Sequence, residues 1–372
     1  MSHFAEIVPE HIRSLPAYVP GKAIAAAENG RRPVKLASNE NPFGPSPRAE
    51  RAAAEALTAA NLYPDTNSTA LAEALAQRHG IGAENLIVAA GASSVLVLLS
   101  RILLGPGLNA IGAERSFISY PILTRAADAE YRTVPMRGDG LDLDAMAGAV
   151  DDNTRLIFLT NPNNPTGTIV TAAELDAFLD RLPASAVVVL DEAYYDFAEA
   201  FAHARGVDYS HAERYVREGR NVVALRTFSK AQGLAALRVG YGMGPAELIG
   251  YLKRLQPTFE VSSAGQAAAL ASMTDHEHYQ KTLRNNCEQA AWLVRQLEEM
   301  GYEPVETWAN FLYCEVDEDA AALAQRLERE GVSIRPLCGA WGARTAIRIT
   351  IGTPEENRRF VEALKAVTAS VG

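Results

Sequence analysis

The sequence predicts an α/β protein in which a larger domain is built on a mostly parallel sheet flanked by helices. Short apolar runs rich in β-branched residues alternate with stretches rich in Ala, Leu and Glu, and this alternation is typical of such sheets. The chain has 372 residues, a length that suits two domains. Hydrophobic residues make up 48% and charged residues 22%, which indicates a folded globular protein with a sizeable core.

The apolar runs of the first two thirds of the chain are short and bounded by turn residues, so we expect buried strands. These strands are predicted at 86–89, 155–160, 186–190 and 221–225. Helices are predicted between and after them, at 94–104, 172–182 and 246–254.

The pattern changes near residue 262. A helix at 276–300, a strand at 311–316, a helix at 319–330, a strand at 346–351 and a helix at 354–368 predict a smaller α+β domain. We therefore expect a large domain over 46–262 and a small C-terminal domain over 263–372. The first 40 residues are rich in Pro, Gly and Ala. We expect residues 1–45 to form an N-terminal arm and part of the small domain.

Composition excludes several classes of function. The formal charge of -10 argues against a protein that binds nucleic acid or the surface of an anionic membrane. Three cysteines without a CxxC pair and seven histidines without an HExxH motif predict no disulfide framework and no metal site. A polar N-terminus and the lack of a long apolar stretch lead us to expect a soluble, cytoplasmic protein.

Polar residues follow each predicted strand of the large domain. These segments are 91–94, 161–167, 191–194 and 226–230, and Arg238 comes soon after the last of them. Because ligands bind beyond the carboxyl ends of parallel strands, we expect these residues to form one site.

This set of side chains matches the chemical needs of pyridoxal 5'-phosphate. Its ring nitrogen needs a carboxylate, its aldehyde a lysine, its phosphate an arginine and backbone N–H groups, and its phenolate oxygen an amide or a phenol. Each residue could also be an unrelated turn or capping residue, and a serine at a helix start is usually just a cap. That alternative explains single residues but not the whole set.

A glycine-rich run at 240–244 could suggest dinucleotide binding. It lacks the GxGxxG spacing and has no acidic residue at the expected place on a following strand, so we interpret these glycines as serving a close-packed strand turn.

Several motifs carry a family resemblance: 14–22 (SLPAYVPGK), 38–45 (SNENPFGP), 63–65 (YPD), 161–167 (NPNNPTG), 191–194 (DEAY), 227–230 (TFSK), 335–336 (RP) and 347–357 (IRITIGTPEEN). With them the chain resembles the fold-type I pyridoxal-phosphate aminotransferases, and within these the histidinol-phosphate aminotransferases, over nearly its whole length. The resemblance implies a transaminase with pyridoxal 5'-phosphate as cofactor.

The resemblance also implies roles for residues around the cofactor. Lys230 would form the Schiff base and later move the substrate's α-proton, and Asp191 would pair with the ring nitrogen. Asn164 and Tyr194 would hydrogen-bond the ring oxygen, and Tyr120 would stack on the ring.

At the cofactor's phosphate, the resemblance implies a cradle made by Ala92, Ser93, Ser229 and Arg238, with Thr227 where relatives often have serine. Serines occupy positions 93 and 94, where relatives commonly have an acidic pair, and the segment 105–112 is also less typical. Tyr63 matches a tyrosine that reaches the neighbouring subunit's cofactor, which implies a homodimer with shared sites.

For the substrate, the resemblance implies contacts from Tyr18, Asn39, Arg335 and Arg348. It favours reversible amino transfer between L-histidinol phosphate and 2-oxoglutarate. Guanidinium groups bind phosphate and carboxylate alike, so aromatic amino-acid transamination stays open, as does a threonine-phosphate type decarboxylase. A regulator on this scaffold is disfavoured because Lys230 is present and no basic helix is apparent.

Overall fold

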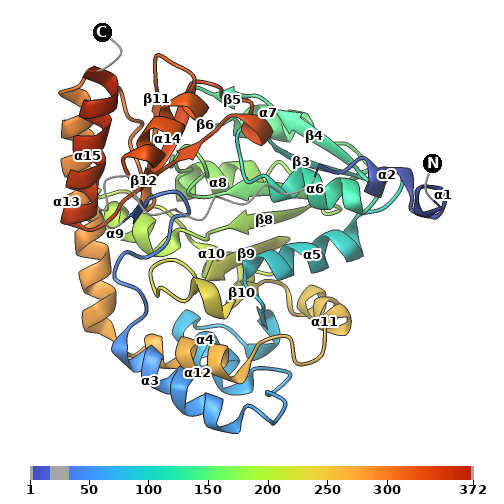
Figure 1. Cartoon of the computed structure of the whole chain (residues 1–372). Helices are drawn as coiled ribbons and strands as arrows, with labels where there is room; N and C mark the ends of the chain where they lie inside the picture. The colour runs from blue at the N-terminus through green and yellow to red at the C-terminus, as the bar shows by residue number, and fades with distance from the viewer. Residues whose placement is uncertain (1–2, 17–32, 370–372) are drawn as a thin grey trace.

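The fold was determined as a computed structural model, which describes residues 3–16 and 33–369. Its centre is a seven-stranded sheet of order β2-β10-β9-β8-β7-β3-β4 (Figure 1). All neighbouring pairs from β9 to β4 are parallel, whereas β10 runs antiparallel to both β2 and β9. The strands are β2 (Leu86–Ala89), β3 (Asn109–Ala113), β4 (Glu130–Val134), β7 (Thr154–Thr160), β8 (Val187–Asp191), β9 (Val222–Thr227) and β10 (Gly240–Met243). The predicted α/β class is therefore confirmed.

Helices cover both faces of this sheet. One face packs on α5 (Ala92–Leu103), α6 (Ser119–Ala126) and α11 (Ala246–Leu255). The other packs mainly on α3 (Pro47–Ala56), α4 (Thr69–His79), α7 (Leu143–Gly148), α8 (Ala172–Leu179), α10 (Ala212–Arg217) and α12 (Ser263–Ser272). Alternate residues of a strand point to opposite faces, so every inner strand must be apolar on both.

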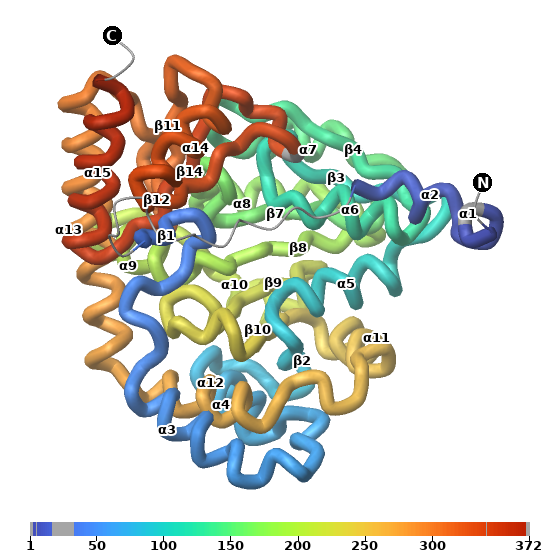
Figure 2. Tube along the Cα trace, viewed as in Figure 1, coloured from blue at the N-terminus to red at the C-terminus, as the bar shows by residue number. Residues whose placement is uncertain are grey.

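The four strands predicted from the sequence are confirmed within two residues at each end. Three strands of the sheet were not predicted. β3 reads Asn-Ala-Ile-Gly-Ala and β10 reads Gly-Tyr-Gly-Met, and small residues and glycine have weak strand propensity. Figure 2 shows β10 beside β9, so the glycine run at 240–244 forms a sheet strand.

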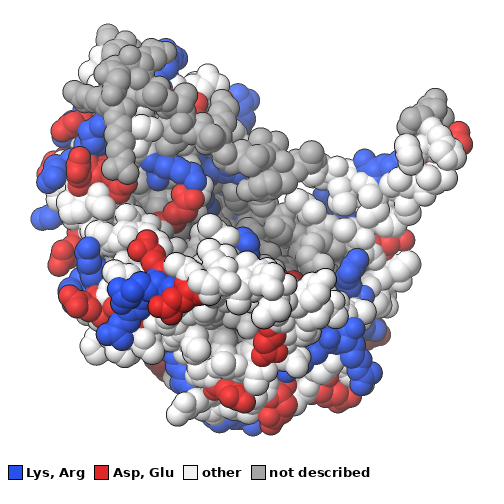
Figure 3. Space-filling model, turned by 60° about the horizontal axis from the view of Figure 1, so that its bottom comes forward, with Lys and Arg blue, Asp and Glu red and all other residues white. Residues whose placement is uncertain are grey.

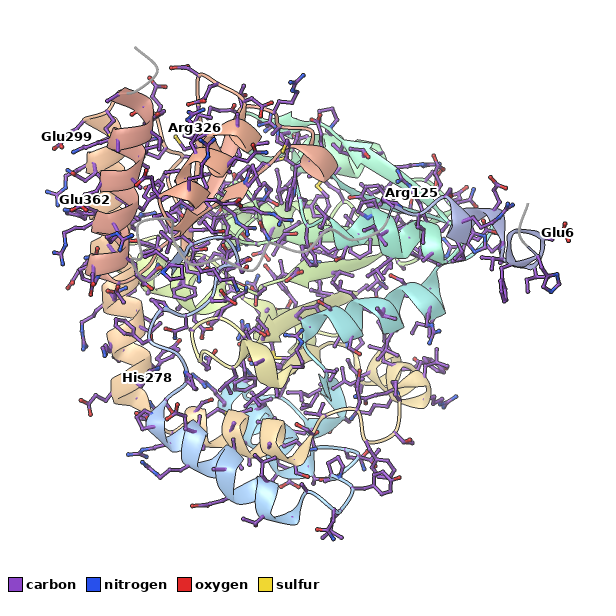
Figure 4. The ribbon with its side chains drawn as sticks, viewed as in Figure 1. Glu6, Arg125, His278, Glu299, Arg326 and Glu362 are labelled. Carbon is purple, nitrogen blue, oxygen red and sulfur yellow. The ribbon has the colours of Figure 1, made fainter. Side chains whose placement is uncertain are left out.

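The small domain is built around an antiparallel sheet of order β11-β14-β13. Its strands are β11 (Phe311–Glu315), β13 (Arg335–Pro336) and β14 (Ala346–Thr350), and β1 (Val34–Lys35) pairs with β12 (Val332–Ser333). Helices α13 (His276–Glu298), α14 (Ala320–Arg329) and α15 (Pro354–Ala369) pack against it. In Figure 4, Glu299 and Glu362 point outward on this side of the molecule.

Shorter elements complete the chain. The N-terminal helices α1 (Phe4–Ile7) and α2 (Glu10–Arg13) project from the body, and α9 (Tyr195–Arg205) lies between the two sheets. A hairpin joins β5 (Met136–Arg137) to β6 (Gly140–Leu141). Four 3₁₀ turns are η1 (Leu57–Ala59), η2 (Ala83–Asn85), η3 (Ala235–Leu237) and η4 (Gly339–Trp341).

The long helix α13 connects the two domains. Near its start, Leu283 packs with Phe197 and Ala231, and farther along Leu293 and Leu297 belong to the small-domain core. The preceding helix α12 packs on α3 and α4. The expected boundary near residue 263 would place α12 in the small domain, and we propose instead that the boundary lies within α13.

Among the described residues, no helix combines the length and apolarity needed to cross a membrane. On the face seen in Figure 3, acidic and basic side chains are interspersed, and the surface is hollowed near its centre.

Candidate functional site

The carboxyl ends of β7, β8 and β9 and the start of α5 surround a cavity of about 200 Å³. Its walls carry both the polar residues predicted from the strand ends and several apolar side chains. The lining residues are Ala92, Ser93, Leu96, Phe117, Thr160, Asn164, Asp191, Ala193, Tyr194, Thr227, Ser229, Lys230, Ala235 and Arg238. The strand-end segments thus meet at one cavity.

One end of the cavity suits an anion. Helix α5 begins at Ala92, and its first backbone N–H groups have no partner within the helix. The Arg238 Nη1 lies 3.4 Å from the Ser229 hydroxyl, which in turn accepts a hydrogen bond from Thr227 at 3.0 Å. A positive helix end, a guanidinium and two hydroxyls are the donors that a phosphate group needs.

Two glycines allow these donors to come together. A Cβ on Gly91 would lie 2.5 Å from Arg238 Nη2, and one on Gly240 would lie 2.3 Å from the backbone nitrogen of Ala92. Gly91 also has a φ of 82°, which glycine adopts without strain. The cradle therefore exists because both positions lack a side chain.

The two serines at the start of α5 have different surroundings. Ser93 lines the cavity, whereas the Ser94 hydroxyl donates to the carboxylate of Glu260, outside the cavity. Glu260 also accepts from Gln256 at 2.8 Å. The Ser94 hydroxyl thus ties the α11–α12 loop to the start of α5.

A buried carboxylate also lines the cavity. Asp191, the last residue of β8, is 4% exposed, and burial raises the pKa of its carboxyl group. It accepts hydrogen bonds from the Tyr120 hydroxyl at 2.8 Å and from the Ala193 N–H at 3.2 Å. Because a buried carboxylate is unfavourable without a cation or proton donor, this group suits a protonated ring nitrogen.

Lys230 also lines the cavity, and its amine is the candidate nucleophile. Burial, and next the positive charge of Arg348, lower the pKa of this lysine to about 8. Its Nζ donates to the backbone oxygens of Ser38 at 3.3 Å and Asn39 at 3.2 Å. A lysine with this pKa is neutral far more often near pH 8 than an ordinary lysine, and only the neutral amine attacks a carbonyl.

The hydroxyl of Tyr194, another residue of the cavity wall, is held by two side-chain amides. It accepts from Asn39 Nδ2 at 2.9 Å and from Asn164 Nδ2 at 3.3 Å, and burial raises the pKa of the phenol. Asn39 has a φ of 56°, and the Thr350 hydroxyl accepts from its backbone N–H at 2.9 Å. These bonds link the N-terminal segment and the small domain to the cavity.

The loop 161–167 presents Asn164. Asn163 fixes this loop because its amide donates to the backbone oxygen of Arg115 at 2.8 Å and accepts from the Ser116 hydroxyl at 3.0 Å. Asn161 closes the loop on itself by a pair of hydrogen bonds with the backbone of Val170, each 2.9 Å long. These hydrogen bonds hold the loop that presents the Asn164 amide, in which two prolines predicted a fixed path.

The two arginines expected to bind substrate are register neighbours across β13 and β14. Arg348 is 6% exposed, and it donates to Asn164 Oδ1 at 2.6 Å and to the Ala37 backbone oxygen at 2.9 Å. The Arg335 guanidinium lies over the ring of Trp341, 5.4 Å from its centre. Tyr18, expected at the same place, lies outside the described residues.

Tyr120 is placed differently from its expected stacking position. It is fully buried, its ring stacks on Phe158 at 4.4 Å, and it does not line the cavity. Phe117, three residues earlier, lines the cavity instead, and Thr160 does so as well. Neither residue was among the predicted site residues, although Phe117 lies only three residues before Tyr120.

Tyr63 lies away from the cavity of its own chain. It is 82% exposed and stacks on Phe259 with 4.4 Å between ring centres. No group of three or more metal-binding side chains occurs among residues 3–16 and 33–369.

The donor set as a whole fits pyridoxal phosphate: the cavity walls carry an anion cradle, a buried carboxylate, a lysine of lowered pKa, a phenol and an amide.

Comparisons with known proteins agree with this fit. The profile of the family "aminotransferase class I and II" matches residues 31–364. The chain is 41% identical to histidinol-phosphate aminotransferase 2 of Pseudomonas aeruginosa, covering 99% of this chain and 100% of that protein. It is also 41% identical to the histidinol-phosphate aminotransferase of Akkermansia muciniphila, over 96% of this chain and 98% of that one.

A solved structure shows the same fold with the cofactor. The histidinol-phosphate aminotransferase of Sinorhizobium meliloti, in complex with pyridoxal-5'-phosphate, superposes with a TM-score of 0.89 at 27% identity, covering 98% of each chain.

Proposed function

This chain belongs to the class I and II aminotransferases, and we propose that it transfers an amino group between L-histidinol phosphate and 2-oxoglutarate. The products are imidazole acetol phosphate and L-glutamate. The proposal draws on relatives of that name that match almost the whole chain, and on the charges around the cavity.

Members of this family depend on pyridoxal phosphate, which when bound supplies an electrophilic carbonyl and a ring that accepts electrons from the α-carbon. The cradle of Ala92, Ser93, Ser229 and Arg238 would hold its phosphate, with Thr227 supporting Ser229. We assign the stacking role to Phe117 in place of Tyr120, because Phe117 is the aromatic side chain on the cavity wall of the 116–120 segment.

Asp191 and Lys230 divide the proton chemistry. The carboxylate of Asp191 would hold a proton on the ring nitrogen, with the Tyr120 hydroxyl orienting that carboxylate. The Lys230 amine would accept and return the α-proton, which requires the neutral form that its pKa of about 8 makes accessible. Tyr194, held by Asn39 and Asn164, would donate to the ring oxygen.

The observation that carries the substrate assignment is the pairing of Arg335 with Arg348 across two strands of the small domain. Two guanidinium groups at one place provide enough donors for the three oxygens of a phosphate monoester. We propose that Tyr18 completes this site from the N-terminal segment.

We also propose a homodimer with shared sites, working in the cytoplasm. Leu62, Tyr63 and Phe259 are 65%, 82% and 41% exposed, and exposed apolar side chains of this kind favour a contact with a second subunit. Through that contact Tyr63 would reach the phosphate of the partner's cofactor.

A single-turnover titration of the cofactor-loaded protein tests the substrate. The visible absorption of the bound cofactor is followed after adding L-histidinol phosphate, and separately phenylalanine, tyrosine and O-phosphothreonine. We expect fast conversion by histidinol phosphate at micromolar concentration, with the aromatic acids slower by orders of magnitude.

Other outcomes would reassign the enzyme. Equal or faster conversion by phenylalanine or tyrosine would make it an aromatic aminotransferase, with Arg348 binding a carboxylate. Release of carbon dioxide from O-phosphothreonine would indicate a decarboxylase.

A further inference from the structure

Trp341 joins the small domain to the wall of the cofactor cavity. It lies in the 3₁₀ turn η4, and its indole Nε1 donates to the backbone oxygen of Ser116 at 2.8 Å. Ser116 directly precedes Phe117, which lines the cavity. A side chain of the small domain is therefore bonded to the loop that supplies the aromatic wall.

The ring of the same tryptophan faces an arginine of the substrate site. The Arg335 guanidinium lies 5.4 Å from the centre of the indole. A cation at this distance is attracted to the negative face of the ring, and tryptophan is the strongest of the aromatic residues in this respect. Arg335 pairs in register with Arg348, so Trp341 contacts one member of the arginine pair directly.

Trp341 and the loop to which it donates are themselves fixed. Its ring packs against a cluster formed by Tyr313, Leu337 and Ala346. The Tyr313 hydroxyl accepts from Arg115 Nη1 at 3.0 Å, which makes a second link between the small domain and the same loop. On the loop side, the Ser116 hydroxyl donates to Asn163 at 3.0 Å.

We propose that Trp341 is a positioning residue that determines affinity for the phosphate end of the amino donor. Its ring holds the Arg335 guanidinium, and its N–H holds the loop carrying Phe117, so one side chain sets the spacing between the anion-binding arginine and the cofactor wall. The proposal rests on the function proposed above, and it adds Trp341 to the residues that select a phosphorylated amino donor.

Steady-state kinetics of the holoenzyme separate the two contacts of Trp341. The variants are Trp341→Ala, Trp341→Phe, Arg335→Ala and the double variant Trp341→Ala/Arg335→Ala. The donors are L-histidinol phosphate and unphosphorylated L-histidinol. Trp292→Phe is the control, because Trp292 lies on α13 and packs against the small-domain core.

We expect Trp341→Ala to raise KM for histidinol phosphate about 10-fold, the range of a partly desolvated cation–π contact, with kcat changed by less than about 3-fold. KM for histidinol should change by less than about 2-fold, because that donor lacks the phosphate group that Arg335 would bind. Trp341→Phe keeps an aromatic face and should recover most of the affinity. In the Arg335→Ala background, Trp341→Ala should add less than about 2-fold.

Calorimetric titration with inorganic phosphate gives a readout without turnover. Its dissociation constant from the holoenzyme should rise in Trp341→Ala by the same factor as KM, and should stay unchanged in Trp292→Phe. Thermal unfolding of each variant identifies any general loss of stability.

Two results would overturn the proposal: an equal loss for both donors, or a full additional loss in the Arg335→Ala background. If Arg335→Ala weakens histidinol phosphate but Trp341→Ala does not, the positioning role is wrong and the proposed function stands. If the unmodified enzyme does not convert histidinol phosphate, the proposed function itself is wrong.

Discussion

At the scale of single residues, the site depends on buried charges that alter each other's protonation. Lys230 is half-buried on the cavity wall, Asp191 and Arg348 are buried close to it, and the charges of both affect the lysine. Burial and the charge of Arg348 both disfavour the protonated amine, whereas Asp191 favours it. The first two effects dominate, so the amine is available at a pH where a solvent-exposed lysine would be protonated.

This balance predicts a pH dependence. We expect the rate at which cofactor-free protein combines with pyridoxal phosphate, followed by visible absorption, to rise with pH with a midpoint near the pKa of about 8 of Lys230. Arg348→Gln should shift the midpoint upward, because removal of the positive charge makes the protonated amine more stable. A midpoint near 10.5, the ordinary value for lysine, would contradict the lowered pKa.

At the scale of elements, the position of the anion cradle depends on strand β10. This strand lies between β2 and β9, and its first residue, Gly240, touches the first residue of α5. The Arg238 side chain reaches the cradle from just before β10, with a φ of 53°. The phosphate site is therefore formed by three elements that meet where glycine leaves room.

Gly240→Ala tests this meeting point. The added Cβ would lie 2.3 Å from the Ala92 nitrogen, so β10 and α5 must move apart. We expect a loss of about 1–3 kcal/mol in the free energy of unfolding, typical of overpacking. Cofactor affinity should fall roughly 10-fold, since a hydrogen bond to a charged group weakens.

Gly250→Ala is the matched control. Gly250 lies in α11, and no atom lies within 4 Å of the position of its Cβ. This variant should gain about 0.5–1 kcal/mol of stability by helix propensity and bind the cofactor unchanged. Equal behaviour of the two variants in cofactor binding would refute the role of the β10–α5 contact.

At the scale of the whole molecule, the site lies where two domains and the N-terminal segment meet. Asn39 comes from the segment after β1, Arg348 from the small-domain sheet, and Lys230 from the loop after β9. Exposed apolar side chains at Leu62 and Tyr63 lie on the large domain, away from that meeting point. The surface that we propose for a second subunit is therefore separate from the cavity.

Leu62→Glu tests that surface. A charge at the centre of an apolar contact is unfavourable, so we expect the variant to be monomeric at micromolar concentration by light scattering after size exclusion. Its kcat/KM should fall at least about 10-fold if Tyr63 serves the partner's site.

Glu362→Lys, on a side chain that points outward from α15, is the control and should remain dimeric and active. A fully active monomer of Leu62→Glu would refute the shared site.

The sequence by itself determined the fold class, the edge strand β2, the adjacent parallel strands β7, β8 and β9, and the polar residues that follow these strands. Buried strands need continuous apolar runs, and the residues after them are polar at fixed positions, so both signals are local. The glycine-rich strand β10 was not predicted, because its place in the sheet depends on contacts with α5 and β9 rather than on strand propensity.

Only the tertiary structure decided which aromatic side chain lines the cavity and what surrounds each arginine. Tyr120 and Phe117 lie three residues apart, and their local pattern does not say which one donates to Asp191 and which one lines the cavity. Trp341 bonds to Ser116 across 225 residues of chain, a contact that no spacing in the sequence encodes. Such choices depend on packing between distant segments, which exists only once the domains are assembled.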